Sequence, residues 1–192
     1  MQKHSCSEKI NLVKERKRIF AIIGSASRNS VNQKLVEKFA ALVEEELSVT
    51  IFNSLRELPH FDPEESIHNP PPKIVELRKE IEQADGILIC TPEYVFGLPG
   101  GLKNAIEWCV STTVFSDKPA GLITASASGK KCHEELQLIM RTVMARFTED
   151  TALLIEGIKG KMNAQGDITE DKTLRELVKF AAAYKTLLKT VH

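Results

Sequence analysis

Short apolar runs alternate along the chain with longer segments in which apolar residues recur every three or four positions. Continuous apolar runs of this length are typical of parallel strands that are covered on both faces. Residues 19–23 form such a run, and we expect further strands at residues 49–52, 87–90, 120–124 and 151–155. The periodic segments have the apolar stripe of amphipathic helices. We expect these helices over residues 32–47, 74–84, 102–110, 136–147 and 174–188.

This alternation predicts one parallel sheet joined by right-handed crossovers. The expected fold class is α/β, a three-layer doubly wound sandwich with a five-stranded parallel sheet of order 2-1-3-4-5. A length of 192 residues suits one such domain. We assign residues 1–17 to a polar tail and residues 18–192 to the domain. Five prolines between residues 53 and 72 predict a long connecting segment without regular secondary structure. The helical stripes place these three residues inward: Val110, Phe147 and Val178.

The charge balance and hydropathy narrow the classes of partner. Lys and Arg number 26, as do Asp and Glu, so the formal net charge is zero. Phosphate backbones attract proteins with a clear basic excess, so this balance argues against nucleic acid as the main partner. No apolar run approaches the ~20 residues of a membrane-spanning helix, and the N-terminus lacks the apolar core of a secretory signal. We therefore expect a cytoplasmic protein that does not enter a membrane.

The four cysteines give no sign of a metal or redox centre. Cys6, Cys90, Cys109 and Cys132 form no CxxC pair and have no metal-ligand spacing with the five histidines. Two of them lie in apolar periodic segments. We expect reduced thiols that pack as small hydrophobic side chains rather than take part in redox chemistry.

Candidate chemistry lies in three loops that follow the first, third and fourth strands, because open α/β sheets bind ligands at the carboxyl ends of their strands. The first loop, residues 24–32, has hydroxyl or amide side chains at five of its last eight positions. It precedes a helix N-terminus, whose free N–H groups favour an anion. One such residue would suffice as a helix cap, so the excess favours phosphate binding. The glycines of a dinucleotide-binding loop and the G-K-[ST] of a Walker loop are absent.

The stretch Thr91–Trp108 begins with a loop of unusual composition. It holds two prolines, three glycines and two aromatic residues before an amphipathic helix begins. Glycines let the main chain approach a flat ligand closely, and prolines fix φ and remove backbone donors. We interpret that ligand as a flavin ring. The third loop, residues 124–129, offers small polar residues and a glycine. By itself it would be an ordinary strand-to-helix turn, but its place beside the other two loops makes it part of the expected pocket.

These motifs resemble the NAD(P)H-dependent FMN reductase family, flavodoxin-like enzymes that include quinone, azo and chromate reductases. The resemblance covers about residues 18–190. Four residues match the motif after the first strand: Gly24, Ser25, Ser30 and Asn32. A longer block matches the motif after the third strand: Thr91, Pro92, Glu93, Tyr94, Pro99, Gly100, Leu102, Lys103, Asn104, Ala105, Ile106, Glu107 and Trp108.

The resemblance implies a set of FMN-binding residues. The phosphate would be held by Ser25, Ser30 and Asn32, with Ser27 and Arg28 beside them. The edge of the isoalloxazine ring would lie along Pro92, Glu93, Tyr94, Val95, Phe96 and Gly97. The other side of the ring would be closed by Ser126, Ser128 and Gly129. Two positions depart from the family pattern, since Ser27 stands in place of an arginine and Val95 in place of an asparagine.

The implied reaction is hydride transfer from NADPH or NADH to FMN, followed by reduction of a quinone, an azo compound or free flavin. Because the cofactor carries the hydride chemistry, we expect no catalytic side chain. Glu93 would cap nearby amides or join a subunit contact rather than act as an acid or base. Lys103 and Asn104 fit a helix N-terminus or an interface. Trp108 is either core or subunit contact, and we favour the contact, because the family usually forms homodimers or homotetramers.

Two binding functions remain as alternatives to the enzyme. A flavodoxin-like electron carrier would share the fold and FMN, but such carriers are strongly acidic, whereas this chain has zero net charge. An FMN-binding sensor without turnover of its own is the other alternative. A phosphoacceptor receiver domain would need acidic residues where this chain has Gly24 and Ser25.

Overall fold

The computed structural model describes residues 15–27 and 29–190. The predictions for most of the tail, for Cys6 and for Arg28 fall outside these described residues. One sheet of five parallel strands has the order β2-β1-β3-β4-β5, which confirms the predicted fold class and strand order. The strands are β1 (Lys17–Ile23), β2 (Leu47–Phe52), β3 (Gly86–Thr91), β4 (Ala120–Ser126) and β5 (Ala152–Glu156).

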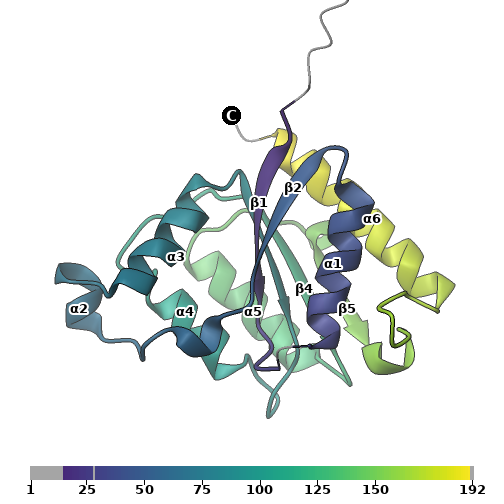
Figure 1. Cartoon of the computed structure of the whole chain (residues 1–192), viewed down its shortest axis with the longest axis horizontal. Helices are drawn as coiled ribbons and strands as arrows, with labels where there is room; N and C mark the ends of the chain where they lie inside the picture. The colour runs from purple at the N-terminus through teal and green to yellow at the C-terminus, as the bar shows by residue number, and fades with distance from the viewer. Residues whose placement is uncertain (1–14, 28, 191–192) are drawn as a thin grey trace, which may run out of the picture.

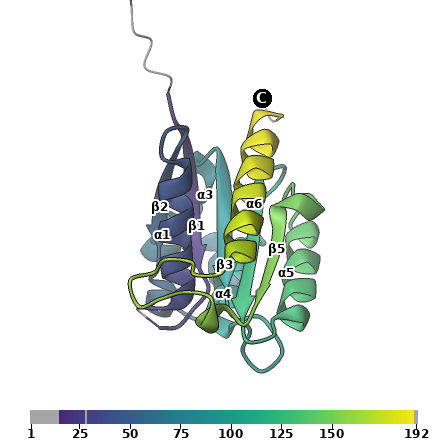
Figure 2. The same cartoon turned by 90° about the vertical axis from the view of Figure 1, so that its right-hand side faces the viewer.

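Helices cover both faces of this sheet (Figure 1, Figure 2). The α-helices are α1 (Val31–Val43), α2 (Pro63–His68), α3 (Pro72–Gln83), α4 (Gly100–Glu107), α5 (Lys130–Thr142) and α6 (Asp171–Lys189). Short 3₁₀ helices are η1 (Leu55–Glu57), η2 (Glu149–Thr151) and η3 (Ile158–Gly160). Helices α1 and α6 pack on one face, and α3, α4 and α5 pack on the other.

The alternation of side chains along β1 shows why its sequence is apolar without a break. Ile19, Ala21 and Ile23 belong to the core layer beneath α1 and α6. Phe20 and Ile22 point to the opposite layer, beneath α3, α4 and α5. Successive strand residues face opposite sides of a sheet, so a strand covered on both faces needs apolar residues at every position. The central strands are thereby fixed in the middle layer.

The structure corrects the predicted end of α1 and the prediction for residues 53–72. Helix α1 ends at Val43 rather than at Leu47, and Leu47 begins β2. Residues 44–46 are three consecutive glutamates, which are unfavourable at the negative end of a helix dipole. Residues 53–72 are not wholly irregular, because they contain η1 and α2. Asp62 caps α2 by accepting the backbone N–H groups of Glu64 and Glu65 at 2.8 and 2.9 Å, and proline stands at the start of that helix.

Three residues that were predicted to face inward do not lie in the helical core. Val110 is 63% exposed and lies beyond the end of α4, and Val178 is 48% exposed on α6. Phe147 follows α5, which ends at Thr142, and is partly buried against the core from outside the helix. Apolar residues also occur singly on protein surfaces. Apolar periodicity alone therefore assigned these three residues to the buried face of a helix when they do not belong to it.

Helix α6 packs so closely on the sheet at Gly86 that a side chain there would have no room. A Cβ atom at this position would lie 2.6 Å from Leu188 Cδ2 and 2.6 Å from the Tyr184 hydroxyl. Gly86→Ala should therefore lower the free energy of unfolding by about 1–3 kcal/mol through overpacking, measured by urea denaturation. Gly160→Ala is the matched control, since a Cβ there meets nothing within 4 Å. Equal stability of the two variants would contradict this account of the core.

Candidate functional site

The loops that follow β1, β3, β4 and β5 meet at the carboxyl edge of the sheet, at the lower end of the molecule in Figure 2. They line a pocket of about 660 Å³, which is within the usual range for small-molecule sites. We call it the strand-exit pocket. Its lining contains Ser25, Ser27, Asn29, Ser30, Val31, Asn32, Pro92, Glu93, Tyr94, Ala125, Ser126, Ala127, Gly157, Ile158, Lys159 and Gly160.

The structure brings eight of the predicted site residues together in this lining: Ser25, Ser27, Ser30, Asn32, Pro92, Glu93, Tyr94 and Ser126. Five other predicted residues lie outside it: Val95, Phe96, Gly97, Ser128 and Gly129. The loop after β5, residues 157–160, also lines the pocket and contributes Lys159, although no motif in the sequence predicted it. Two features of the sequence could have indicated this loop: it follows β5, the strand next to β4, and it contains Gly157 and Gly160.

The first loop presents polar groups at the N-terminus of α1. Ser30 is the helix cap, and its Oγ accepts the backbone N–H of Gln33 at 3.1 Å. Ser25 Oγ accepts the backbone N–H of Ser27 at 3.2 Å. The first turn of α1 contains no acidic residue. The positive end of the helix dipole is therefore left without a neighbouring carboxylate in that turn, as an anion site requires.

Asn32 has a structural bond of its own. It is 3% exposed, and its Nδ2 donates to the backbone oxygen of Ala125 at 2.9 Å. This bond connects the start of α1 with the end of β4. Gly24 makes the neighbouring contact. Its N–H donates to the oxygen of Cys90 at 2.8 Å, and a Cβ at this position would collide with Thr91 Oγ1. The walls of the pocket are thus in direct contact with one another.

The tip of the second loop is a strained turn. The Tyr94 N–H donates to Gly97 O at 3.1 Å and the Gly97 N–H to Tyr94 O at 3.0 Å. The residues between them, Val95 and Phe96, have φ of 51° and 58°. These are the features of a type I′ turn, which favours Asn-Gly at its centre. Left-handed backbone costs a non-glycine residue roughly 1–2 kcal/mol, and asparagine tolerates it best. The departure of Val95 from the family asparagine therefore has a backbone cost.

Two carboxylates connect this loop with α5. Glu93 Oε1 accepts the N–H of Gly129 and Oε2 that of Cys132, both at 3.1 Å. Glu135 Oε2 accepts the N–H of Leu98 at 2.7 Å. The expectation that Glu93 caps nearby amides is confirmed, because both of its oxygens serve the positive N-terminal end of α5.

Helix α4 holds a neighbouring segment of the chain in place. Asn104 Oδ1 accepts the N–H of Phe61 at 2.7 Å, and its Nδ2 donates to Pro59 O at 2.9 Å. Trp108 is fully buried, donates from Nε1 to Pro59 O at 2.9 Å, and packs edge-on against Phe61. The favoured interpretation of Trp108 as a subunit contact is therefore wrong, since the ring belongs to the core. Lys103 pairs with Glu107 at 3.9 Å along the helix.

The three described cysteines are buried and free. Burial raises the pKa of the Cys109 and Cys132 thiols to about 12, and it raises the pKa of Cys90 further still. Such thiols stay protonated at neutral pH and are poor nucleophiles. The expectation that they pack as small hydrophobic side chains is confirmed for these three. No cluster of potential metal ligands occurs among the described residues, and no described helix is long and apolar enough to cross a membrane.

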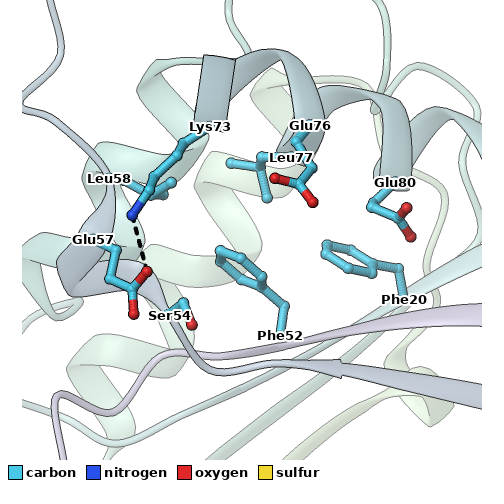
Figure 3. A pocket seen from close by; sticks show the side chains of 9 residues that line it. All are labelled: Phe20, Phe52, Ser54, Glu57, Leu58, Lys73, Glu76, Leu77 and Glu80. Carbon is cyan, nitrogen blue, oxygen red and sulfur yellow. Dashed lines mark hydrogen bonds and ion pairs between the residues drawn. The ribbon is translucent and has the colours of Figure 1, made fainter. Parts of the chain in front are cut away.

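A second hollow lies apart from this site. A cavity of about 290 Å³ lies between α3 and the sheet, and Figure 3 shows the side chains that line it. The rings of Phe20 and Phe52 form part of its wall, with Glu76 and Glu80 above them. It shares no lining residue with the strand-exit pocket. Of these two cavities, only the strand-exit pocket is lined by residues that were predicted to bind a ligand.

The strain in the Tyr94–Gly97 turn predicts a gain in stability. Replacing Val95 and Phe96 by the favoured pair, Val95→Asn with Phe96→Gly, should raise the free energy of unfolding by ~1–2 kcal/mol, because both positions then accept positive φ. Chemical denaturation measures this change. Val110→Asn is the control, since Val110 is also exposed but has no positive φ. A loss of stability in the double variant would show that the turn is not strained.

The buried thiols predict slow labelling. In a Cys6→Ser variant, the folded protein should react with a chromogenic disulfide reagent at pH 8 at least ~100-fold more slowly than free cysteine, because burial disfavours the thiolate. All three remaining thiols should react at once in concentrated urea. A rapidly labelled thiol in the folded protein would refute the structural role assigned to these side chains.

One family profile matches most of the chain. The sequence profile of the NADPH-dependent FMN reductase family matches residues 17–158. A quinone reductase of Escherichia coli K12 is 27% identical over 184 residues, which cover 92% of this chain and 98% of that protein. An NAD(P)H-dependent FMN reductase of Pseudomonas aeruginosa is 28% identical over 167 residues, covering 84% and 89%.

Solved structures show the same fold. The flavoenzyme NAD(P)H:(acceptor) oxidoreductase FerB of Paracoccus denitrificans matches with a TM-score of 0.79 at 24% identity, over 91% of this chain and 98% of that one. An archaeal flavodoxin matches with a TM-score of 0.61 at 13% identity, over 90% and 99%. The family profile spans most of the chain, and the strand-exit pocket contains part of both motifs, namely Ser25, Ser30, Asn32, Pro92, Glu93 and Tyr94. The chain belongs to the NADPH-dependent FMN reductase family.

Proposed function

We propose that this protein is an FMN-dependent oxidoreductase that takes hydride from NADPH or NADH and passes the electrons to a small-molecule acceptor of the quinone class. The observation that carries the proposal is the composition of the strand-exit pocket. Hydroxyl groups and a helix N-terminus lie in one wall, and the proline-rich main chain after β3 lies in another. The quinone reductase among its relatives supports the choice of acceptor.

The donor groups of the pocket fit the phosphate of FMN. Ser25, Ser27 and Ser30 supply hydroxyls beside the free N–H groups of α1. Lys159 contributes a positive charge to the same lining from the loop after β5. A phosphate monoester carries about two negative charges at neutral pH, and helix N-termini with such donors are common phosphate sites. These groups would hold the charged end of the cofactor.

The remaining walls fit a flat and largely apolar group. Pro92 has no N–H, and Ala125, Ala127 and Ile158 supply small or apolar surfaces. Bound FMN would supply the hydride acceptor, which no side chain of this pocket provides. The role of the protein is then to orient the ring and to shield it from water. Glu93 is no candidate for a proton-transfer group, since both of its oxygens accept backbone N–H groups.

An electron carrier is the second candidate, because the archaeal flavodoxin shares the fold. Steady-state oxidation of NADPH by the FMN-loaded protein, with 1,4-benzoquinone as acceptor, separates the two functions. An enzyme gives sustained turnover with parallel double-reciprocal plots, as a ping-pong cycle requires. A carrier or a sensor gives no sustained turnover without a separate reductase. The expected homodimer or homotetramer and the cytoplasmic location stay predictions, and the first can be measured by sedimentation.

The phosphate assignment can be tested without changing the Ser30 cap. Replacing Ser25 and Ser27 together by alanine should weaken FMN binding by at least ~1–2 kcal/mol, because two hydrogen bonds to a charged group are lost. Calorimetric titration measures the affinity. Riboflavin, which lacks the phosphate, should bind equally to the variant and to the unchanged protein. Ser116→Ala, a serine in the loop before β4, is the control variant.

A fall in riboflavin affinity as large as the fall for FMN would remove these serines from the phosphate site. In that case the ring, rather than the phosphate, would contact the first loop.

A further inference from the structure

The Tyr94–Gly97 turn is attached to α5 at both of its ends. Glu93, directly before the turn, accepts the N–H groups of Gly129 and Cys132 at the start of α5. Glu135, on α5 itself, accepts the N–H of Leu98 directly after the turn at 2.7 Å. The carboxylate of Glu93 thus belongs to the loop and bonds to the helix, whereas that of Glu135 belongs to the helix and bonds to the loop. Hydrogen bonds from N–H groups to an ionised carboxylate are the strong kind.

The helix is a rigid support for these bonds. Leu136 and Met140 of α5 are fully buried against the sheet. Glu135 lies beside Leu136 on the helix, and its Oε2 would be 3.1 Å from a Cβ placed on Gly97. The carboxylate is therefore packed against the last residue of the turn as well as bonded to the next N–H. A turn with left-handed φ at Val95 and Phe96 needs such support, because strained backbone persists where its surroundings enforce it.

The turn adjoins the pocket although its tip lies outside it. Tyr94 is both the first residue of the turn and part of the pocket lining. Its hydroxyl lies 3.4 Å from Ser25 Oγ in the first loop. A change in the turn would therefore alter the contact between Tyr94 and the first loop. Glu135 is absent from the lining, so any effect that it has on a bound ring passes through this loop.

We infer that Glu135 is a positioning residue of this site, which holds the Tyr94–Gly97 turn in its left-handed conformation and thereby sets the place of Tyr94 beside bound FMN. The inference deepens the proposed function and rests on it for the part that concerns FMN. The part that concerns the turn stands on the protein alone.

Glu135→Ala, Glu135→Gln and the control Glu134→Ala test the inference. Glu134 is the preceding residue of α5 and pairs only with Lys131 among the described residues. In FMN-free protein, Glu135→Ala should speed amide exchange at Tyr94, Gly97 and Leu98 by about tenfold or more, since these N–H groups lose their protection. Glu135→Gln keeps an acceptor oxygen and should restore much of that protection. Glu134→Ala should leave it unchanged.

A double-mutant cycle separates positioning from a general effect on stability. In the Val95→Asn/Phe96→Gly background the turn no longer needs enforcement, so Glu135→Ala should change exchange at Gly97 less than about threefold there. FMN affinity and the midpoint potential of the bound flavin should follow the same non-additive pattern. Additive effects on exchange in the two backgrounds would overturn the inference.

The two proposals fail in different ways. If the unchanged protein binds no FMN, the proposed function fails while the exchange cycle still tests the support of the turn. If FMN binds with the same affinity and potential in all variants although the exchange cycle is non-additive, Glu135 supports the turn without positioning FMN, and the inference is overturned.

Discussion

The constraint on which this molecule depends is that all five strands run in the same direction and are covered on both faces. A parallel strand can be followed only by a crossover, so every strand ends at the same edge of the sheet. That edge collects the loops after β1, β3, β4 and β5, which come from positions far apart in the sequence. The strand-exit pocket is thus a product of topology, and the particular residues of each loop decide which ligand it suits.

Much of the fold could be predicted because its signals are strong and local. Five short runs rich in apolar residues predicted the strands, and their alternation with helical stripes predicted a doubly wound parallel sheet, whose common order 2-1-3-4-5 is the one observed. The ends of the helices were harder to predict, because apolar periodicity carries no information about the residues that end a helix. The glutamates 44–46 end α1 through their charge, and Asp62 begins α2 through its side-chain cap. Both effects come from charged residues at helix ends, which a search for apolar stripes does not detect.

Site residues could be predicted where they belong to a motif of several residues. They could not be predicted where only the packing of the folded chain brings them to the pocket. The serines of the first loop and Pro92 to Tyr94 lie in the pocket as expected. The loop of residues 157–160 carries no such motif, and it reaches the pocket because β5 lies next to β4. Trp108 shows the converse case, since a ring in a family motif was taken for a surface contact and proved to be core. The hydrogen bond of its indole to Pro59 depends on a segment about fifty positions away.

The buried bond between Asn32 and Ala125 has a consequence for how the pocket can change shape. In the sheet β3 lies between β1 and β4, so this bond joins elements on either side of an intervening strand. The first loop and the exit of β4 cannot spread apart without leaving a buried amide unsatisfied, which is costly. The breadth of the opening is consequently fixed by strand spacing. The margin that carries the Tyr94–Gly97 turn is bonded to α5, so adaptation to acceptors of different size is left to the margin formed by the glycines around Lys159.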